Sequence, residues 1–386
     1  MPSPSHTVWS SELSPFGLKV RAILDHAGMP YRWRPARGGR LENFRTARRV
    51  QMLRRGRLPV AFPEMSGLDE LPSVPFVLGD DGQNVYDSTA IADWVSRTHP
   101  SELGPLIPDD PLLCFLARLI DEYFDELGLY MAHHNRWVVA ATDNDAGWRL
   151  AGEFAFLFPG PMRYPAAEWF SARQVRRLPY LFSVADPSGP GPAVSARRRP
   201  PSREGFPPTH ELLDMAFLRT LERVELVLSD QEYLLGSAFT LADASAYGQL
   251  CMNTHDAAVN ALMELRAPLT HAWVKRIEKR MFARPRPGSP LVLGDRLAAL
   301  LEEIGRVFVP LMKQNAAAYE RHYEAGQRRF NEAAFDAGEA LYDGELDGVP
   351  FRSVAKSFQV VVWRRLLEQY RALDAKLRAR LPLSLE

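Results

Sequence analysis

The chain has 386 residues, and its 47 acidic and 47 basic residues give a formal net charge of zero. This length allows two or three domains, and no segment approaches the roughly 18 consecutive apolar residues of a transmembrane helix, which excludes a membrane span. The N-terminus lacks a basic region followed by an apolar core, so we expect no secretory signal. Cys114 and Cys251 fall inside apolar helical patterns and should be buried small hydrophobes, which favours a reducing cytoplasm.

The first predicted elements alternate between strand and helix. Thr7 to Trp9 indicates a short strand, Ser14-Pro15-Phe16 a turn, and Tyr31 to Trp33 a second strand. Between the strands, apolar residues recur at helical spacing up to Gly28. These residues are Phe16, Val20, Ile23, Leu24 and Ala27.

The next segment is strongly basic, with ten arginines against the single acid Glu42 between Tyr31 and Arg57. A nucleic-acid or membrane patch would have this charge, but the only aromatic residues interleaved with the arginines are Trp33 and Phe44. Arginine also outnumbers lysine throughout the chain, which indicates compositional bias. We therefore expect a solvated helix and loop, without a nucleic-acid partner.

The most informative stretch runs from Val74 to Ile91. An apolar run meets Pro75, a turn follows at Gly82, and Asp87-Ser88 opens a helix. If the Val74–Pro75 bond is cis, the backbone of Val74 points outward and can pair with an extended ligand. Ser88 is a suitable helix cap whose helix end favours a ligand carboxylate, while Asp87 favours a ligand ammonium. An amino acid head group would satisfy both.

This order of strands, turn, Asp-Ser pair and helix resembles the glutathione-binding half of the glutathione S-transferase family. The sequence TLADAS at 240–245 is similar to the family's helix-capping signature, in which Thr240 caps the helix and Asp243, three residues later, completes the capping box. The resemblance implies an α/β thioredoxin-like N-terminal domain followed by an all-α helical C-terminal domain, with extra C-terminal helices. We expect domains at 1–104 and 105–286 and an extension at 287–386.

The resemblance also implies a serine that activates the thiol of glutathione. Ser14 stands at the start of the first predicted helix, where it resembles the serine of serine-type transferases that donates a hydrogen bond to the glutathione sulfur. Ser10 and Ser11 are the rivals, and Ser14 is equally suited to capping its helix, a role compatible with catalysis. Neither position 14 nor position 17 is cysteine, which argues against dithiol or glutaredoxin-like chemistry.

The second domain begins with helical periodicity from Pro111 to Arg136. The pair His133-His134, with Glu122 or Glu126 a turn or two back, suggests a metal site, but adjacent histidines point to different helix faces. We predict no metal there and assign the histidines to the lining near the thiol. Further helices are predicted at 210–228, 241–251 and 273–281.

Two segments fall outside the family pattern. Residues 138–207 combine many aromatic residues with prolines, and we expect an inserted subdomain rather than a substrate pocket, ending in a loop at 185–208. Residues 287–386 contain two long amphipathic helices, which should pack on the second domain, close over its substrate side or mediate self-association. Tyr342 to Gly348 is acidic and turn-rich and is predicted to be a loop, not a calcium site.

The sequence thus predicts an enzyme that directs the thiolate of glutathione onto a small hydrophobic electrophile, by conjugation, dehalogenation, ether cleavage or isomerisation. Glutathione would be held by Val74, Pro75, Asp87 and Ser88, with one arginine available for a carboxylate, and Ser14 would be catalytic. The protein would need no metal and would be a possible homodimer. The alternative is a non-catalytic member of the same fold that binds a peptide or protein partner or acts as a scaffold.

Overall fold

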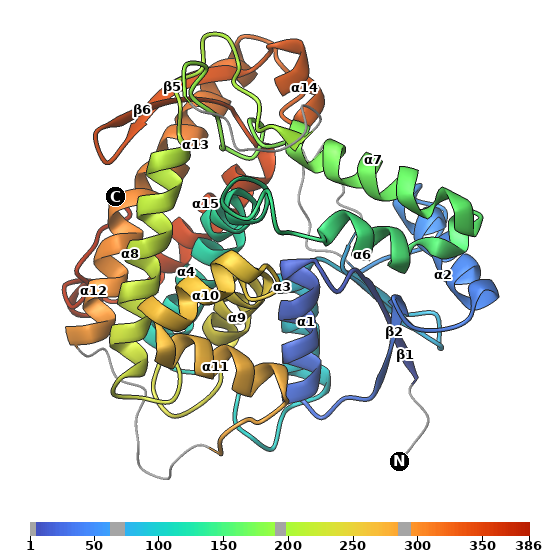
Figure 1. Cartoon of the computed structure of the whole chain (residues 1–386). Helices are drawn as coiled ribbons and strands as arrows, with labels where there is room; N and C mark the ends of the chain where they lie inside the picture. Colours follow the sequence, from blue (N-terminus) through green and yellow to red (C-terminus); the bar gives the residue numbers. More distant parts are fainter. Residues whose placement is uncertain (1–4, 62–73, 190–197, 285–294) are drawn as a thin grey trace.

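The computed structural model describes residues 5–61, 74–189, 198–284 and 295–386. It consists of a small sheet domain, a helical domain and two additions that pack against them (Figure 1). The sheet and the helical bundle lie side by side, with α1 and α3 between them. None of the helices in the described ranges has the length and apolar character that crossing a membrane requires.

The N-terminal domain contains a four-stranded sheet in the order β2-β1-β3-β4. Strand β1 pairs in parallel with β2 and antiparallel with β3, which pairs antiparallel with β4. The strands are β1 (His6–Ser10), β2 (Tyr31–Pro35), β3 (Phe76–Gly79) and β4 (Asn84–Tyr86), and the helices are α1 (Pro15–His26), α2 (Arg40–Arg54) and α3 (Ser88–Thr98). This is the strand and helix order that the sequence predicted, with the basic segment forming α2.

Strand periodicity explains how helices cover both faces of the sheet. Successive strand residues point to opposite faces, so each strand supplies side chains to two separate apolar clusters. The face toward α1 and α3 carries Val8, Val77 and Val85, and the face toward α2 carries Trp9, Phe76, Leu78 and Tyr86. The first cluster is continuous with the core of the helical domain, which fixes α1 and α3 against the bundle.

The helical domain is built around α9, which is buried along its whole length. Its glycine, Gly248, permits the close approach of α1, because a Cβ there would lie 2.5 Å from the carbonyl oxygen of Pro15 and 3.1 Å from the amide of Lys19. The start of α1 is therefore held directly against the second domain. The elements are α4 (Pro111–Tyr123), η1 (Phe124–Gly128), α5 (Leu129–His134), η2 (Asn135–Val139), α8 (His210–Leu228), α9 (Leu241–Asn253), α10 (Ala257–Arg266) and α11 (Pro268–Glu278).

The capping box predicted at the start of α9 is present. The Asp243 carboxylate accepts hydrogen bonds from the amide of Thr240 at 2.9 Å and from the amide of Leu234 at 2.8 Å. Burial raises the pKa of Asp243 to about 6, although these donors oppose the shift. The motif is structural, as the sequence indicated, because it joins the start of α9 to the preceding loop.

The aromatic insertion packs on the N-terminal domain. It contains α6 (Ala146–Glu153), η3 (Ala155–Leu157), η4 (Gly160–Met162) and α7 (Arg163–Arg176). Phe156 is buried in the cluster on the α2 face of the sheet, and the ring centroids of Trp9 and Phe156 lie 6.2 Å apart. The described part of the insertion thus packs on the N-terminal domain, and it reaches the loop after β1.

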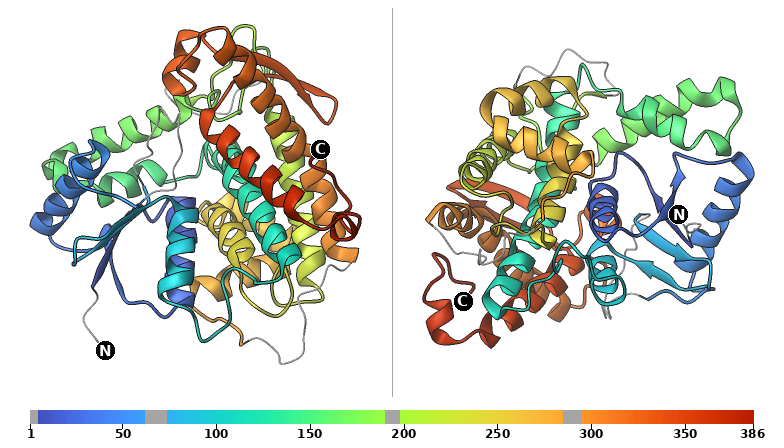
Figure 2. Two further views of the ribbon diagram at one scale, coloured as in Figure 1. Left: turned by 180° about the vertical axis from the view of Figure 1, so that it is seen from behind. Right: turned by 90° about the horizontal axis from the view of Figure 1, so that it is seen from below.

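The C-terminal extension packs on the helical domain, which was one of the three predicted possibilities. Helix α15 lies along α4, where the rings of Phe115 and Tyr370 are 5.7 Å apart, and α12 lies along α8 (Figure 2). Its elements are α12 (Asp295–Glu303), η6 (Ile304–Phe308), α13 (Val309–Glu324), α14 (Glu332–Ala337), β5 (Leu341–Leu346), β6 (Val349–Val354), α15 (Ser357–Ala372) and α16 (Ala375–Arg378).

The prediction of a loop from Tyr342 to Gly348 is wrong, because these residues form most of a β-hairpin. Leu346 pairs with Val349, so Asp347 and Gly348 make a two-residue turn. Both turn residues have positive φ, 52° and 77°, which Asp-Gly pairs adopt readily. This dipeptide between β-type residues was a hairpin signal that the acidic composition obscured.

Candidate functional site

The register of the sheet places the predicted site residues at the same end of neighbouring strands, which we call the site edge of the sheet. Trp9 lies opposite Phe76, and Phe76 lies opposite Tyr86. The residues next in line, Ser10 and the loop to Ser14, Pro75, and Asp87, therefore leave the sheet at the same end. The Val74–Pro75 peptide bond is cis, as predicted.

Ser14 is the N-cap of α1. Its Oγ accepts a hydrogen bond from the amide of Gly17 at 3.2 Å, and Pro15 occupies the first helical position. A hydroxyl that accepts one bond keeps its own proton for donation. The capping role that the sequence indicated is thus real, and it leaves the hydroxyl proton of Ser14 free for a nearby anion.

The two rival serines differ from Ser14 in their surroundings. Ser10 is completely buried at the end of β1, against the backbone of Gly17. The Oγ of Ser11 accepts a hydrogen bond from the amide of Leu13 at 3.0 Å, and its hydroxyl also interacts with the carboxylate of Glu153. Ser14 is thus the serine of the three that caps α1, whereas Ser11 is engaged by Leu13 and Glu153, and the buried Oγ of Ser10 has no hydrogen-bond partner among the described residues.

Asp87, and not Ser88, is the N-cap of α3, which corrects the sequence prediction. Asp87 has φ of 77°, and its Oδ1 accepts hydrogen bonds from the amides of Thr89 and Ala90, each at 3.0 Å. A carboxylate can hold two amides at once, so it caps the helix better than the neighbouring hydroxyl. Both bonds end on Oδ1, which leaves Oδ2 as an acceptor for a ligand ammonium.

Ser88 is the first residue of α3, and its amide has no acceptor within the helix. Its hydroxyl is buried and donates to Oδ2 of Asp125 in η1 at 3.3 Å. The side chain therefore connects the N-terminal domain to the helical domain, while the amide and the helix end remain suited to a carboxylate. This second contact could not be predicted from the sequence, because the two residues are far apart in the chain.

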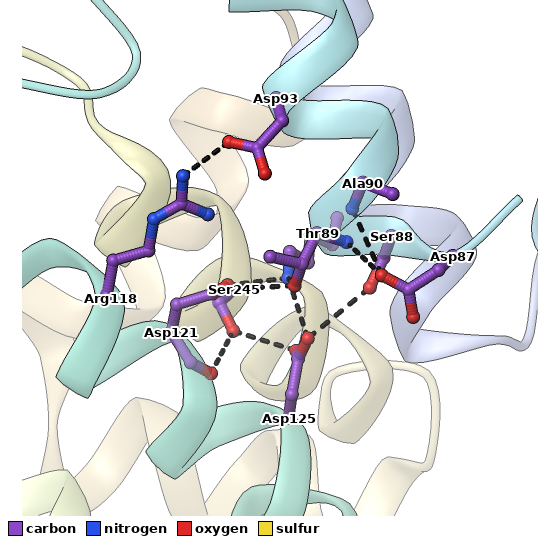
Figure 3. A network of polar contacts seen from close by, with 10 residues as sticks. Asp87, Ser88, Thr89, Ala90, Asp93, Arg118, Asp121, Asp125 and Ser245 are labelled. Carbon is purple, nitrogen blue, oxygen red and sulfur yellow. Dashed lines mark hydrogen bonds and ion pairs between the residues drawn. The ribbon is translucent and has the colours of Figure 1, made fainter. Parts of the chain in front are cut away.

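A buried ion cluster lies behind Ser88 and joins the two domains (Figure 3). The ammonium of Lys19 in α1 lies 2.5 Å from Asp121 Oδ1 and 2.6 Å from Asp125 Oδ2. Thr89 and Ser245 complete the cluster, since the Thr89 hydroxyl donates to Asp121 at 3.1 Å and the Ser245 hydroxyl donates to Asp125 at 2.9 Å. Four helices, α1, α3, α4 and α9, and the turn η1 therefore meet at one set of charges.

The cluster stays charged because its members are paired. Burial opposes the charge of Lys19, but Asp121 and Asp125 outweigh it and raise the lysine pKa. Burial also raises the pKa of Asp121 to about 6, although Lys19 opposes that shift. Burial raises the pKa of Asp87 as well, and Lys19 lies close enough to favour its charged form. The start of α3 thus borders a buried cation.

The C-terminal extension reaches the same junction from the other side. Burial raises the pKa of Glu126 to about 7. Gln359 and Lys356 oppose this shift, and the negative charge of Asp87 supports it. Gln359 donates to the hydroxyl of Tyr130 at 2.9 Å, and the Lys356 ammonium also contacts that hydroxyl. The start of α15 therefore contacts the helical domain next to Glu126 and Tyr130.

The insertion supplies one residue that the sequence did not identify as part of the site. Oε1 of Glu153, the last residue of α6, accepts a hydrogen bond from the amide of Glu12 at 3.1 Å, and Ser11 also interacts with it. Burial raises the pKa of Glu153 to about 7. A titratable carboxyl thus supports the loop that leads to Ser14. A proline-rich aromatic segment gives no signal for this contact.

The predicted role of the paired histidines is wrong for His134. Its side chain is fully buried, and its ring nitrogens lie 2.9 Å from Ser183 Oγ and 3.0 Å from Asp214 Oδ1. A ring held in this way cannot line an open substrate site. Burial lowers the pKa of His133 to about 3, so that ring is neutral.

No metal site was predicted, and within the described residues one group could offer three ligand atoms. Atoms of Cys251, His255 and Glu278 lie within 4.8 Å of one another. Burial raises the pKa of the Cys251 thiol to about 11, and burial and nearby cations lower the pKa of His255 to about 3. A protonated thiol and surrounding positive charge both oppose a divalent cation, so we assign no metal to this group. The cations are Arg149, Arg136, Lys275 and Arg21.

A cavity of about 270 Å³ lies at the opposite end of α1 from Ser14. Its walls include Ile23, His26 and Val95, together with the segment from His99 to Asp109 that leads into the second domain. It is therefore separate from the site edge of the sheet.

Comparison with known proteins gives two family matches. The family model for the glutathione S-transferase N-terminal domain matches residues 13–98, and that for the C-terminal domain matches residues 210–280. The insertion lies between the two matches, and the extension follows the second one. No curated protein matches the chain.

Several solved structures resemble the chain at low identity. Beta-etherase LigF from Sphingobium sp. strain SYK-6 is 19% identical, with 78% of this chain and 98% of that chain covered and a TM-score of 0.40. A glutathione S-transferase from Rhodospirillum rubrum F11 is 16% identical, with 73% and 96% covered and a TM-score of 0.39. Maleylacetoacetate isomerase from Anaeromyxobacter dehalogenans 2CP-1, with bound GSH, is 17% identical, with 75% and 100% covered and a TM-score of 0.32. Likenesses at this level do not select a reaction.

Proposed function

Since the chain belongs to the glutathione S-transferase family, with both family domains in order, we propose that it binds glutathione and directs the thiolate onto a small hydrophobic electrophile. The observation that carries this proposal is the convergence of three groups at the site edge of the sheet. These are the capped start of α1 at Ser14, the cis Val74–Pro75 bond and the start of α3 at Asp87-Ser88.

The γ-glutamyl and cysteinyl parts of the tripeptide each have a matching group. The carboxylate of the γ-glutamyl head suits the Ser88 amide and the positive end of α3, and its ammonium suits Oδ2 of Asp87. The backbone of Val74 suits the extended cysteinyl part, as an added strand would. The thiol would then reach the start of α1, where Ser14 and the helix end favour the anion.

The chemistry follows from the thiolate. Its sulfur forms a bond to an electrophilic carbon, and the leaving group departs with the bonding electron pair, or, in an addition, the pair of a double bond moves and is later protonated. The Ser14 hydroxyl donates a hydrogen bond to the sulfur and lowers the thiol pKa, so that more thiolate is present at neutral pH. The choice among conjugation, dehalogenation, ether cleavage and isomerisation depends on the electrophile.

The binding part of this proposal is tested with two matched variants. Ser88 and Ser245 each donate a hydroxyl hydrogen bond to Asp125, at 3.3 Å and 2.9 Å, but only Ser88 lies at the start of α3. In the proposed complex the Ser88 hydroxyl turns from Asp125 to the ligand carboxylate, so Ser88→Ala should weaken glutathione binding about tenfold, the effect of one hydrogen bond to a charged group, while Ser245→Ala should change it little. Equilibrium dialysis with labelled glutathione measures both.

Equal affinity in the wild type and Ser88→Ala would show that Ser88 serves only the domain junction. Equal weakening in both variants would show that the Asp125 network, and not ligand contact, controls the site. No binding by the wild type would favour the alternative, a scaffold of the same fold.

A further inference from the structure

The exposed apolar side chains of the described residues are concentrated at one end of the molecule. Of fourteen large apolar side chains that are exposed, seven belong to α2 or to the insertion. Their exposed fractions lie between 45% and 67%. They are Leu41, Phe44, Trp148, Leu157, Met162, Tyr164 and Trp169. Neither the fold nor the proposed glutathione site accounts for this concentration.

The two contributing segments are neighbours in space. Helix α2 lies beside the turn that joins α6 to α7, in Figure 1 and in both views of Figure 2. The guanidinium of Arg40 donates to the carbonyl oxygen of Phe156 at 3.2 Å. Phe44 is four residues after Arg40 and so lies on the same face of α2 as the residue that contacts η3. The apolar side chains of the two segments therefore border one surface.

This surface is also strongly basic. Seven arginines of α2 and its flanks are exposed, and the acid within that segment, Glu42, is paired with Arg34 at 2.9 Å. Across the turn, the Arg163 guanidinium lies 4.0 Å from the centre of the Trp148 ring. The exposed arginines are Arg37, Arg40, Arg45, Arg48, Arg54, Arg55 and Arg57. We call this set of arginines and the seven apolar side chains the arginine–aromatic surface.

We propose that the arginine–aromatic surface docks on an anionic lipid bilayer. Arginine binds lipid phosphates, and each basic residue near an anionic membrane strengthens binding to it. Tryptophan, tyrosine, phenylalanine and leucine side chains at the same surface can enter the headgroup layer without any segment crossing the bilayer. This mode of attachment agrees with the lack of a membrane-crossing helix in the described ranges.

Two other occupants fit the surface less well. A nucleic acid would pair with the arginines, but Leu41, Leu157 and Met162 cannot stack on bases and would stay in contact with water. A second copy of the chain would bring seven exposed arginines against seven others in a symmetric contact, which like charges oppose. The bilayer is the one surface among these that matches both the charge and the apolar side chains.

Co-sedimentation with vesicles tests the proposal, using phosphatidylcholine alone and phosphatidylcholine with phosphatidylserine. The wild type should bind the anionic vesicles, and binding should fall as salt is added. The charge-reversal variant Arg45→Glu with Arg48→Glu should bind about a hundredfold more weakly, since each lost cation weakens binding and each added anion opposes it. The apolar variant Phe44→Ser with Leu157→Ser should bind about tenfold more weakly.

Matched controls lie elsewhere on the surface. Arg364→Glu with Arg371→Glu reverses two exposed arginines of α15, and Leu265→Ser removes the most exposed of the large apolar side chains from α10. Both should bind vesicles like the wild type. Circular dichroism checks the fold of every variant. The salt dependence of wild-type binding tests the electrostatic contribution to vesicle binding without any substitution.

Three outcomes would overturn the proposal. They are failure of the wild type to bind anionic vesicles, equal losses in the test and control variants, and single-stranded RNA binding that displaces the vesicles and is lost with the same arginines. Self-association in sedimentation velocity that Phe44→Ser with Leu157→Ser abolishes would assign the surface to a second copy instead. The test uses no glutathione, so its result is independent of the proposed reaction.

Discussion

At the scale of single residues, each side chain of the candidate site already makes a structural hydrogen bond. Ser14 accepts the amide of Gly17 while its proton stays free, and Asp87 caps α3 through one oxygen while the other stays available. Ser88 combines an amide at the start of α3 with a hydroxyl bond to Asp125. Capping thus orients each group, and the remaining donor or acceptor can face the ligand.

Glu153 is the residue whose environment most directly predicts pH dependence. Burial raises its pKa from the ordinary value of 4.5 to about 7, so the folded protein holds a proton that the unfolded chain releases. Stability should therefore decrease as pH rises between about 4.5 and 7. Glu153→Gln keeps the neutral form, so the loss of unfolding free energy between pH 5 and pH 8 should shrink by on the order of 2 kcal/mol.

Urea unfolding at several pH values measures this effect, and Glu168→Gln in α7 is the control, because Glu168 forms an ordinary pair with Arg198 on the same insertion. An unchanged pH profile in Glu153→Gln would mean that the carboxyl is ionised without cost in the folded protein. A profile changed equally by both substitutions would trace the effect to the charge of the insertion as a whole.

At the scale of elements, the junction between the domains contains a buried ion cluster where it borders the start of α3. Helices α1, α3, α4 and α9 meet at Lys19, Asp121 and Asp125, and Gly248 lets α9 approach the start of α1. A buried ion group of this kind costs more when one member is removed than it contributes as a whole. It fixes how α3 and its head-group site stand relative to the second domain.

Removing the cation of this junction should be severe. Lys19→Met leaves two buried carboxylates without their counter-charge and should lower the unfolding free energy at pH 7 by about 3–5 kcal/mol. Arg118→Gln, which breaks the less buried pair with Asp93, should cost about 1 kcal/mol or less. The loss in Lys19→Met should be smaller at pH 5, because burial raises the pKa of Asp121 to about 6 and its protonation removes one of the unpaired charges.

Denaturant midpoints of both variants at the two pH values provide the comparison. If Lys19→Met costs no more than Arg118→Gln, or costs the same at both pH values, the cluster is not the electrostatic centre of the junction.

At the scale of the whole molecule, the sequence predicted those structural features that depend on a local residue pattern. The strands, α1, α8, the capping box at Thr240 and Asp243 and the cis bond before Pro75 all follow from periodicity or from short motifs. The hairpin at Asp347-Gly348 carried an equally local signal, but it was predicted as a loop because its acids were weighed above its turn residues.

Contacts between distant segments were not predictable in this way. Lys19 meets Asp125 across 106 positions, and Glu12 meets Glu153 across 141. A single sequence has no periodicity that links such pairs, because they form only when domains, insertion and extension are docked. The positions of the candidate site residues in the sequence were therefore predictable. The distant side chains that form hydrogen bonds and ion pairs around them were not.

The central claim is that the start of α1 stabilises the thiolate of bound glutathione, and titration of thiolate absorbance tests it most directly. With saturating glutathione, the wild type should show thiolate at a pH below that at which free glutathione ionises, because Ser14 and the helix end favour the anion. Ser14→Ala should keep most of the binding but shift the titration to higher pH, with a loss of activity that shrinks as pH rises. No thiolate near neutral pH in the wild type, or identical titrations for the two proteins, would contradict the account.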